Sequence, residues 1–249
     1  MAQKNRTVID PRQAERRRSL IYKIGAAVVL IVIAVGVTFW AINHNKDSAS
    51  TTGGSDTPTV MRPDGSIRIT SAPAGTEPKV VITTVEDFQC PGCRAFEQSF
   101  GGTLAELEKN PQVAVDYHPV AFLDRMSTTN YSSRAMNAST CVAESTAKNG
   151  DWSIWLKFHN LLFTNQPEEG GAGLPDSELI SLAKQAGAEG ITDCIENNQF
   201  GQWVAKQTAD TTSNPEFQGT PWIRINGQQF DPQAGPQGLT DAVNAALAK

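Results

Sequence analysis

A pair of closely spaced cysteines, Cys90-Pro91-Gly92-Cys93, limits the possible folds of this chain more than any other part of its sequence. The apolar, β-branched run at 80–85 before it has the length and composition of a buried strand. Pro91 suits the first position of a helix, because a proline there loses no hydrogen bond. Apolar side chains then recur at helical spacing at Phe96, Phe100, Leu104 and Leu107. The predicted helix places the two sulfurs about one turn apart, close enough to form a disulfide without backbone movement.

The position of Cys90 at the start of that helix predicts how the pair reacts. Free backbone N–H groups and the helix dipole favour a thiolate at an N-terminus. We therefore expect Cys90 to attack and Cys93, one turn further in and more covered, to resolve the mixed disulfide. A zinc site is disfavoured, because zinc takes four ligands and the chain has no second CxxC and no closely spaced histidine pair. A purely structural bond is also disfavoured, since so short a loop adds little stability.

The first 66 residues divide into three parts of different character. Residues 24–42 form a stretch of 19 residues without a charge, long enough to span a bilayer as a helix. Residues 1–23 carry seven basic and two acidic side chains, which predicts a cytoplasmic basic tail and an extracytoplasmic location for the chain after residue 43. A cleaved signal peptide is the alternative, although the apolar stretch is longer than such a peptide needs. Residues 43–66 are small and polar, as expected of a flexible linker.

The rest of the chain is acidic. The formal net charge of the whole chain is -5, so the part after residue 23 is left with -10. An acidic body argues against nucleic acid as a partner. Its length suits a single folded domain over residues 67–249.

The order of predicted elements in this domain indicates the α/β class. Strands are predicted at 67–70 and 113–120, and the strand–helix–strand order around the cysteines implies a right-handed crossover between parallel strands. Asn226-Gly227 predicts a hairpin over 222–230, and a final helix begins near residue 236. Four helices are predicted between these two groups of strands, near 128–146, 152–162, 176–187 and 191–204.

Two motifs in this order resemble the thioredoxin superfamily: the run from Asp87 to Cys93, and Gly219-Thr220-Pro221-Trp222 at the entry to the hairpin. Within it, the chain resembles the DsbA-like thiol-disulfide oxidoreductases, whose thioredoxin fold carries a helical insertion. The resemblance covers residues 67–249 and implies an insertion at about 125–212, behind a single N-terminal transmembrane helix. The anchor and the second cysteine pair are similar to DsbA-like proteins of actinobacterial and other Gram-positive cell envelopes.

The resemblance also implies a substrate site next to the cysteines. Pro221 should follow a cis peptide bond and pack against the active disulfide. The backbone of Thr220 should then pair with an extended substrate strand. The alternative is that Pro221 only begins an edge strand.

The chain departs from the family pattern at two positions. Gly92 stands where the best-known DsbA proteins have histidine, so a strongly oxidising potential is not implied. Thr84 stands where many relatives bury an acid. Either Glu86 or a water would then handle the proton of Cys93.

The other two cysteines, Cys141 and Cys194, fall on separate predicted helices, each on an apolar face. An even number of cysteines in an oxidising compartment favours pairing. We expect a structural disulfide that closes a loop of about 54 residues and adds about 4 kcal/mol of stability. Two buried free thiols are the alternative.

These features predict a single-pass protein of the cell membrane that acts as a protein disulfide oxidoreductase on unfolded exported proteins with free thiols. By resemblance, a VKOR-like or DsbB-type membrane protein reoxidises it, no bound cofactor or metal is required, and the enzyme is a monomer. One alternative is an envelope thiol reductase, for example in cytochrome maturation. Another is a non-catalytic thioredoxin-like module that binds peptides. His44, His118 and His159 are predicted to be surface or core residues rather than ligands.

Overall fold

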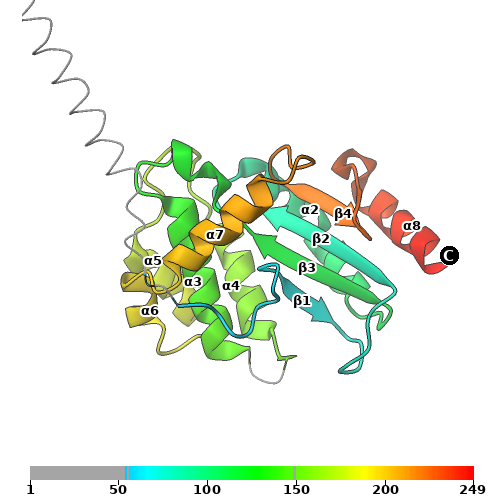
Figure 1. The fold of residues 1–249 in the computed structure, drawn as a ribbon, viewed down its shortest axis with the longest axis horizontal. Coiled ribbons are helices and arrows are strands. Elements are labelled where there is room, and N and C mark those ends of the chain that lie inside the picture. Colours follow the sequence, from blue (N-terminus) through cyan, green and yellow to red (C-terminus); the bar gives the residue numbers. More distant parts are fainter. Residues whose placement is uncertain (1–53, 55, 148–149) are drawn as a thin grey trace, which may run out of the picture. The chain divides into compact units, whose positions relative to one another are not determined.

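The computed structural model describes residue 54, residues 56–147 and residues 150–249. The predicted cytoplasmic tail and membrane anchor, residues 1–42, lie outside the described residues. In the part of the chain that the structure describes, no helix combines the length and the apolar character needed to cross a membrane. The elements below all belong to the unit Thr51–Lys249 (Figure 1).

A mixed five-stranded sheet forms the centre of this unit. Its strands are β1 (Ile67–Thr70), β2 (Val80–Glu86), β3 (Val113–Pro119), β4 (Trp222–Ile225) and β5 (Gln228–Gln229), in the order β1-β3-β2-β4-β5. The pair β2 and β3 is parallel, as the predicted crossover requires, and the other three pairs are antiparallel. Every residue of β3 is buried, as expected of a central strand covered on both faces.

Two helices, α2 (Pro91–Leu107) and α8 (Gly235–Leu247), pack against each other and against the sheet. Phe96, Phe100 and Leu104 are the buried apolar face of α2, and Leu239 and Val243 are that of α8. The helix that begins at the cysteine motif is therefore held in place by the apolar side chains whose spacing predicted it. Its first turn lies at the end of β2.

A block of helices is inserted between β3 and β4. In Figure 1 it lies to the left of the sheet, and α8 lies to the right. Its elements are η1 (Phe122–Met126), α3 (Tyr131–Thr146), α4 (Ser153–Thr164), α5 (Asp176–Ala186), α6 (Thr192–Glu196) and α7 (Gly201–Thr212). Helix α3 is the middle of the block, because it contacts α4, α5, α6 and α7. The α/β fold with a helical insertion is thus as predicted.

Two boundaries differ from the prediction, and both have a local cause. The helix predicted over 191–204 is two helices, because Asn198 adopts a left-handed conformation (φ 47°) between α6 and α7. The helix predicted to begin near 128 begins at Tyr131, because Asn130 is also left-handed (φ 53°). Asparagine is one of the few residues that adopt this conformation at low cost.

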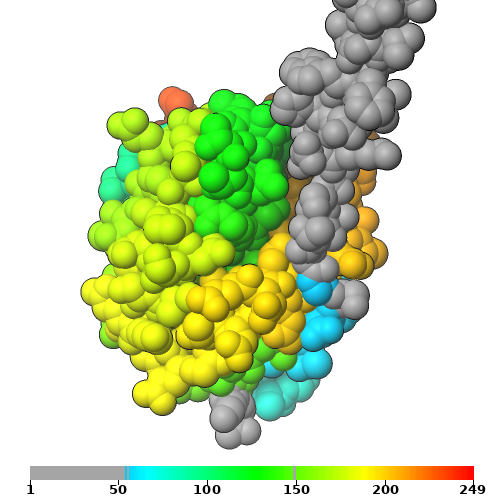
Figure 2. Space-filling view, turned by 90° about the vertical axis from the view of Figure 1, so that its left-hand side faces the viewer, coloured from blue at the N-terminus to red at the C-terminus, as the bar shows by residue number. Residues whose placement is uncertain are grey.

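Residues 56–66, which the sequence analysis placed in the linker, lie on the folded unit. Val60 and Met61 pack against the hydrophobic core. The Glu144 carboxylate of α3 accepts hydrogen bonds from the backbone N–H of Thr59 and, at 2.9 Å, from that of Val60. Figure 2 shows the start of this segment, in blue, beside the yellow and orange surface of α6 and α7. The described part of the predicted linker therefore has fixed contacts.

Candidate active site

Cys90 is positioned by the junction between β2 and α2. Strand β2 ends at Glu86, and Cys90 is the N-cap residue of α2, in an extended conformation with φ -76° and ψ 117°. The residue is 8% exposed, and its sulfur lies 3.2 Å from the carbonyl oxygen of Thr220, to which the thiol form donates a hydrogen bond. The Cys90 sulfur thus lies at a helix N-terminus beside the loop that enters β4.

The surroundings of Cys90 favour its thiolate. A hydrogen bond from the Cys93 thiol is the largest influence on the pKa of Cys90, which is lowered to about 6 although burial acts in the opposite direction. Hydrogen bonds from the Thr220 side chain and from the backbone N–H groups of Cys93 and Gly92 also lower it. Cys90 is therefore mostly ionised at pH 7, and the thiolate is the nucleophilic form of cysteine.

Cys93 has the opposite character. It has no exposed surface, and burial raises the pKa of its thiol well above the usual range. The negative charges of Glu86 and of the Cys90 thiolate act in the same direction. The Cys93 sulfur lies 3.4 Å from the backbone nitrogen of Asp87, which donates to it. The two thiols, both free in this structure, are thus a reactive and a protected cysteine on one turn of helix.

The loop before β4 completes the site. The peptide bond between Thr220 and Pro221 is cis. A Cβ atom at position 92 would lie 3.1 Å from Cδ of Pro221 and 3.6 Å from the Cys90 sulfur, so a side chain there would require Pro221 to shift by a few tenths of an ångström. The structure brings the predicted site residues Cys90, Cys93, Thr220 and Pro221 together.

The helical insertion is tied to the active site by side chains that the sequence analysis did not single out. The amide nitrogen of Gln166 donates a hydrogen bond of 2.9 Å to the carbonyl oxygen of Cys90. The buried Asp87 carboxylate accepts hydrogen bonds from Ser132 on α3 (2.6 Å) and from the backbone N–H of Leu123 (2.8 Å). The position of the cysteine turn therefore depends on the insertion as well as on the sheet.

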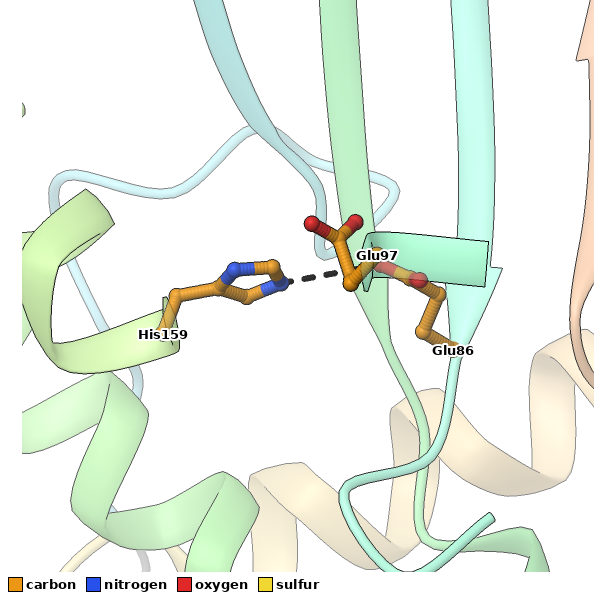
Figure 3. A group of neighbouring side chains, drawn as sticks. All are labelled: Glu86, Glu97 and His159. Atoms are coloured by element: carbon orange, nitrogen blue, oxygen red, sulfur yellow. Dashed lines mark ion pairs between the residues drawn. The ribbon is translucent and has the colours of Figure 1, made fainter. Parts of the chain in front are cut away.

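A cluster of buried titratable groups lies beneath the cysteines. Glu86 ends β2, Glu97 lies on α2 and His159 lies on α4, and Figure 3 shows the imidazole directed toward the two carboxyl groups. The distance from His159 Nε2 to Glu86 Oε2 is 3.5 Å. Burial raises the pKa of Glu86 and of Glu97 to about 8 and lowers the pKa of His159. Each of the three side chains is therefore neutral over a wider range of pH than it is in water.

Among the described residues, this cluster has potential ligand atoms close enough together to be compared with a metal site. One ligand atom from each of Glu86, Glu97 and His159 lies within 4.8 Å of the others. They supply three of the four ligands that zinc takes, and a water would have to be the fourth. The donor set therefore meets the requirements of a zinc site only in part.

Cys141 and Cys194 lie apart from this site and are joined by a disulfide bond. The bond links α3 to α6 with a Cα–Cα distance of 6.0 Å. Cys141 is 2% exposed. The bond cross-links two helices of the insertion.

The helix, the ionised and the buried thiol, and the loop that meets them are an arrangement suited to thiol-disulfide exchange on a thioredoxin-type fold. A family model described as thioredoxin matches residues 75–245. Among solved structures, the chain is similar to reduced DsbA from Mycobacterium tuberculosis, with 34% identity, a TM-score of 0.63, and coverage of 74% of this chain and 93% of that one. It is also similar to reduced DsbG from Mycobacterium tuberculosis, with 34% identity, a TM-score of 0.65, and coverage of 76% and 91%.

The chain belongs to the thioredoxin family, and within it to the DsbA-like thiol-disulfide oxidoreductases. A curated relative, the serine/threonine-protein kinase PknE of Mycobacterium tuberculosis, is 34% identical over 155 residues, which cover 58% of this chain and 27% of the kinase. The match thus takes in about a quarter of the kinase's length.

Proposed function

We propose that this chain is an extracytoplasmic thiol-disulfide oxidoreductase that introduces disulfide bonds into exported proteins. The observation that carries the proposal is the contrast between two thiols on one turn of helix: Cys90 ionises near pH 6, and Cys93 is buried with a raised pKa. The stabilised Cys90 thiolate favours the reduced form of the pair. It therefore favours transfer of the disulfide to a substrate.

The proposed reaction begins at the Cys90 sulfur, because Cys93 is buried and out of reach of a substrate. A substrate thiolate attacks the Cys90 sulfur of the Cys90–Cys93 disulfide, and Cys93 leaves as a thiolate that takes up a proton. A second thiolate of the substrate then attacks the substrate sulfur of the mixed disulfide, and Cys90 leaves as a thiolate. The substrate has lost two electrons, and the Cys90–Cys93 pair has gained them.

The loop before β4 is the proposed contact for the substrate backbone. The Thr220 carbonyl oxygen lies 3.2 Å from the Cys90 sulfur and Pro221 follows it in the chain, so an extended peptide that reaches this sulfur passes beside them. Aromatic side chains from η1 and from this loop pack together nearby, with Phe217 between Phe122 and Trp222. Trp222 is buried and Phe122 and Phe217 are half-buried, so this cluster holds the loop against the domain.

The cellular setting is proposed from the sequence. Residues 24–42 anchor the chain in the cell membrane as a single span, residues 1–23 stay in the cytoplasm, and the catalytic domain lies outside. A VKOR-like or DsbB-type membrane protein reoxidises Cys90 and Cys93, and the enzyme works as a monomer. The Cys141–Cys194 disulfide has a structural role in the helical insertion.

Oxidative refolding tests the proposal. The oxidised full chain is mixed with a reduced, unfolded protein that needs several disulfides for activity. We expect the substrate to gain disulfides and the Cys90→Ser variant to fall to the uncatalysed rate, while a variant with serine at both Cys141 and Cys194 keeps its activity. Undiminished function in Cys90→Ser would leave the non-catalytic peptide-binding alternative.

The direction of electron flow has its own measurement. Equilibration of the full chain with glutathione gives the reduction potential of the Cys90–Cys93 pair. A potential above that of glutathione supports the oxidase. A potential well below it, together with free Cys90 and Cys93 thiols in cells, supports the reductase alternative.

A further inference from the structure

Arg224 on β4 is a cation without a charged partner. Its guanidinium carbon lies 4.2 Å from the centroid of the Trp222 ring, two residues earlier on the same strand. No carboxylate of the described residues lies within ion-pairing distance of it. By contrast, the half-buried Arg68 and Arg134 each pair with an aspartate. Stacking on Trp222 therefore holds a positive charge that the described residues leave uncompensated.

The same two side chains have buried N–H groups without acceptors. Trp222 is 5% exposed, and its Nε1 atom has no hydrogen-bond partner in the described residues. The buried Nε atom of Arg224 has none among them either. Buried donors are usually paired in folded proteins, and an indole and a guanidinium can only donate. The chemistry that suits this pair is therefore an acceptor, and the charge of Arg224 favours an anionic one.

Trp222 and Arg224 line an open cavity of about 420 Å³ between the loop before β4 and the hairpin. The polar side chains around the rest of this cavity are Glu216, Gln218, Gln228 and Gln229. Glu216 is the one acid among its lining residues, and it is exposed. The cavity thus combines one fixed cation with amide groups that can donate to a ligand.

A second cavity, of about 210 Å³, is also lined by Trp222 and Arg224 but has a different charge. Its lining includes two carboxylates, Asp64 and Asp210. Ser66 donates to the first, and Lys206 pairs with the second. Two carboxylates make this smaller cavity unsuitable for a further anion, so the larger cavity is the candidate site.

The pairing of β4 places the larger cavity relative to the reacting sulfur. Strand β5 pairs with Arg224 and Ile225. The Phe230 N–H donates to the Ile223 carbonyl oxygen at 2.8 Å. Before that point, no strand of the described chain pairs with the side of β4 away from β2. A client strand that runs alongside Thr220 therefore ends where it meets β5, next to the cavity.

We propose that Arg224, held by Trp222, forms a subsite that binds a carboxylate side chain of the client, two to four residues from the reacting cysteine. A strand rises about 3.3 Å per residue, so a client segment of this length spans the distance along β4 from Thr220 to Arg224. A guanidinium presents its N–H groups in a planar fork that matches a carboxylate. The inference rests on the proposed function and adds to it a feature of the preferred clients.

This preference is opposite in sign to the effect of the whole domain. The chain after residue 23 has a formal charge of -10, so its overall field repels an acidic peptide. Glu216, in the same cavity, acts in the same direction. A faster reaction with an acidic client would therefore report a local contact with a cation and not the net charge.

Matched peptides test the subsite. Each has a single cysteine, capped ends, and one variable residue, glutamate or glutamine, placed two, three or four positions before or after the cysteine. The peptide cysteine is activated as its 2-pyridyl disulfide. The Cys90 thiolate of the reduced full chain attacks the peptide sulfur, and pyridine-2-thione, an uncharged chromophore, leaves. Stopped-flow absorbance with the chain in excess gives the rate for each peptide.

We expect the wild-type chain to react about fivefold faster with the glutamate peptide than with the glutamine peptide at one or more of these positions, and added salt to reduce this ratio. Arg224→Gln should bring the ratio to one or below and leave the rate with the glutamine peptide unchanged. Arg224→Lys keeps the charge but loses the fork, so it should keep part of the ratio. Glu216→Gln should increase the ratio, because it removes an acid from the cavity.

Arg125→Gln is the matched control. The Arg125 guanidinium also lies over an aromatic ring, 4.3 Å from the centroid of Phe122, but the residue is on η1 and does not line the cavity. This variant loses the same charge and should keep the wild-type ratio. An equal loss of the ratio in Arg125→Gln and Arg224→Gln would overturn the inference, since net charge alone would then set the preference.

A wild-type chain that reacts no faster with the glutamate peptide at any position would also overturn the inference, and so would an Arg224→Gln chain that keeps the wild-type ratio. If circular dichroism shows that Arg224→Gln is unfolded, Arg224→Lys and Glu216→Gln replace it, and unchanged ratios in both would overturn the inference. The proposed function fails separately, if the oxidised wild-type chain oxidises no substrate thiol.

Discussion

The two cysteine pairs of this chain share one chemistry and differ in their surroundings. Cys90 and Cys93 are free and lie on the first turn of α2, where one sulfur is ionised and reachable. Cys141 and Cys194 are 53 residues apart in the sequence and join two helices of the insertion. Cys141 lies in the body of α3, away from the free N–H groups of a helix start. The ionised N-cap thiol of Cys90 thus distinguishes the first pair, whereas Cys141 and Cys194 are joined and cross-link two helices.

The largest expected effect comes from removing the buried member of the first pair. Cys93→Ser leaves Cys90 able to attack a disulfide and deletes the thiol that would displace the attacked partner and form the Cys90–Cys93 disulfide. We expect mixed disulfides between Cys90 and disulfide-bearing partners to accumulate, and oxidase turnover to fall by more than about a hundredfold because no Cys90–Cys93 disulfide can form. Non-reducing gels and mass spectrometry of the trapped complexes measure this. The absence of such complexes would remove the division of roles between Cys90 and Cys93.

Removing the second pair should change stability and spare chemistry. Serine at both Cys141 and Cys194 opens a loop with a sequence separation of 53 residues, so we expect the free energy of unfolding to fall by about 4 kcal/mol. Denaturant unfolding monitored by circular dichroism gives the value. The rate at which Cys90 reacts with an aromatic disulfide is the control and should not change. A variant of unchanged stability would contradict the structural role of the bond.

Cys90 should make the stability of the reduced chain depend on pH, whereas in the oxidised chain Cys90 has no thiol to titrate. Folding lowers the pKa of Cys90 from its ordinary value of 9.0 to about 6, so the folded reduced protein gains stability from the thiolate. This gain is fully present above pH 9 and is lost as the pH falls through 6. We expect the difference in urea midpoint between reduced and oxidised chains to favour the reduced form at pH 8 and to shrink at pH 5. A constant difference would mean that the Cys90 thiolate is not stabilised by folding.

The smallest effect tests the contact between the insertion and the active site. Gln166→Ala removes the hydrogen bond of 2.9 Å to the Cys90 carbonyl oxygen. We expect a loss of about 1 kcal/mol in stability and a change of less than about threefold in the rate of Cys90. Gln199→Ala is a control in the same insertion, because its hydrogen bond goes to the exposed Asp56. Equal effects of the two variants would remove the special role of Gln166.

Local sequence was sufficient to predict the elements that hold Cys90. An apolar run, a proline at the first helical position and side chains at helical spacing determine β2 and α2. The Asn226-Gly227 turn likewise predicted the hairpin of β4 and β5. Each of these signals lies within a few residues of the structure that it produces.

The buried cluster beneath the cysteines was not predictable in the same way. Glu86, Glu97 and His159 come from three elements and meet only because α4 of the insertion packs against α2. A buried glutamate and an exposed one look alike in a sequence. The one signal present was the chemistry of Cys93, which requires an acid, and it indicated Glu86 without excluding a water.

The fixed path of residues 56–66 was missed for a related reason. The segment is polar and carries no periodic pattern, and its order comes from contacts with distant residues such as Glu144. Hydrogen bonds to backbone N–H groups leave no trace in composition. Polar segments next to a folded domain are therefore poorly described by their own sequence.

The most direct test of the central claim is a titration of the reduced chain by thiolate absorbance at 240 nm. The account predicts one thiolate with a midpoint near pH 6 that disappears in Cys90→Ser, and no ionisation of Cys93 over the range in which the protein stays folded. A midpoint close to the ordinary value of 9.0, or a signal that survives in Cys90→Ser, would contradict it.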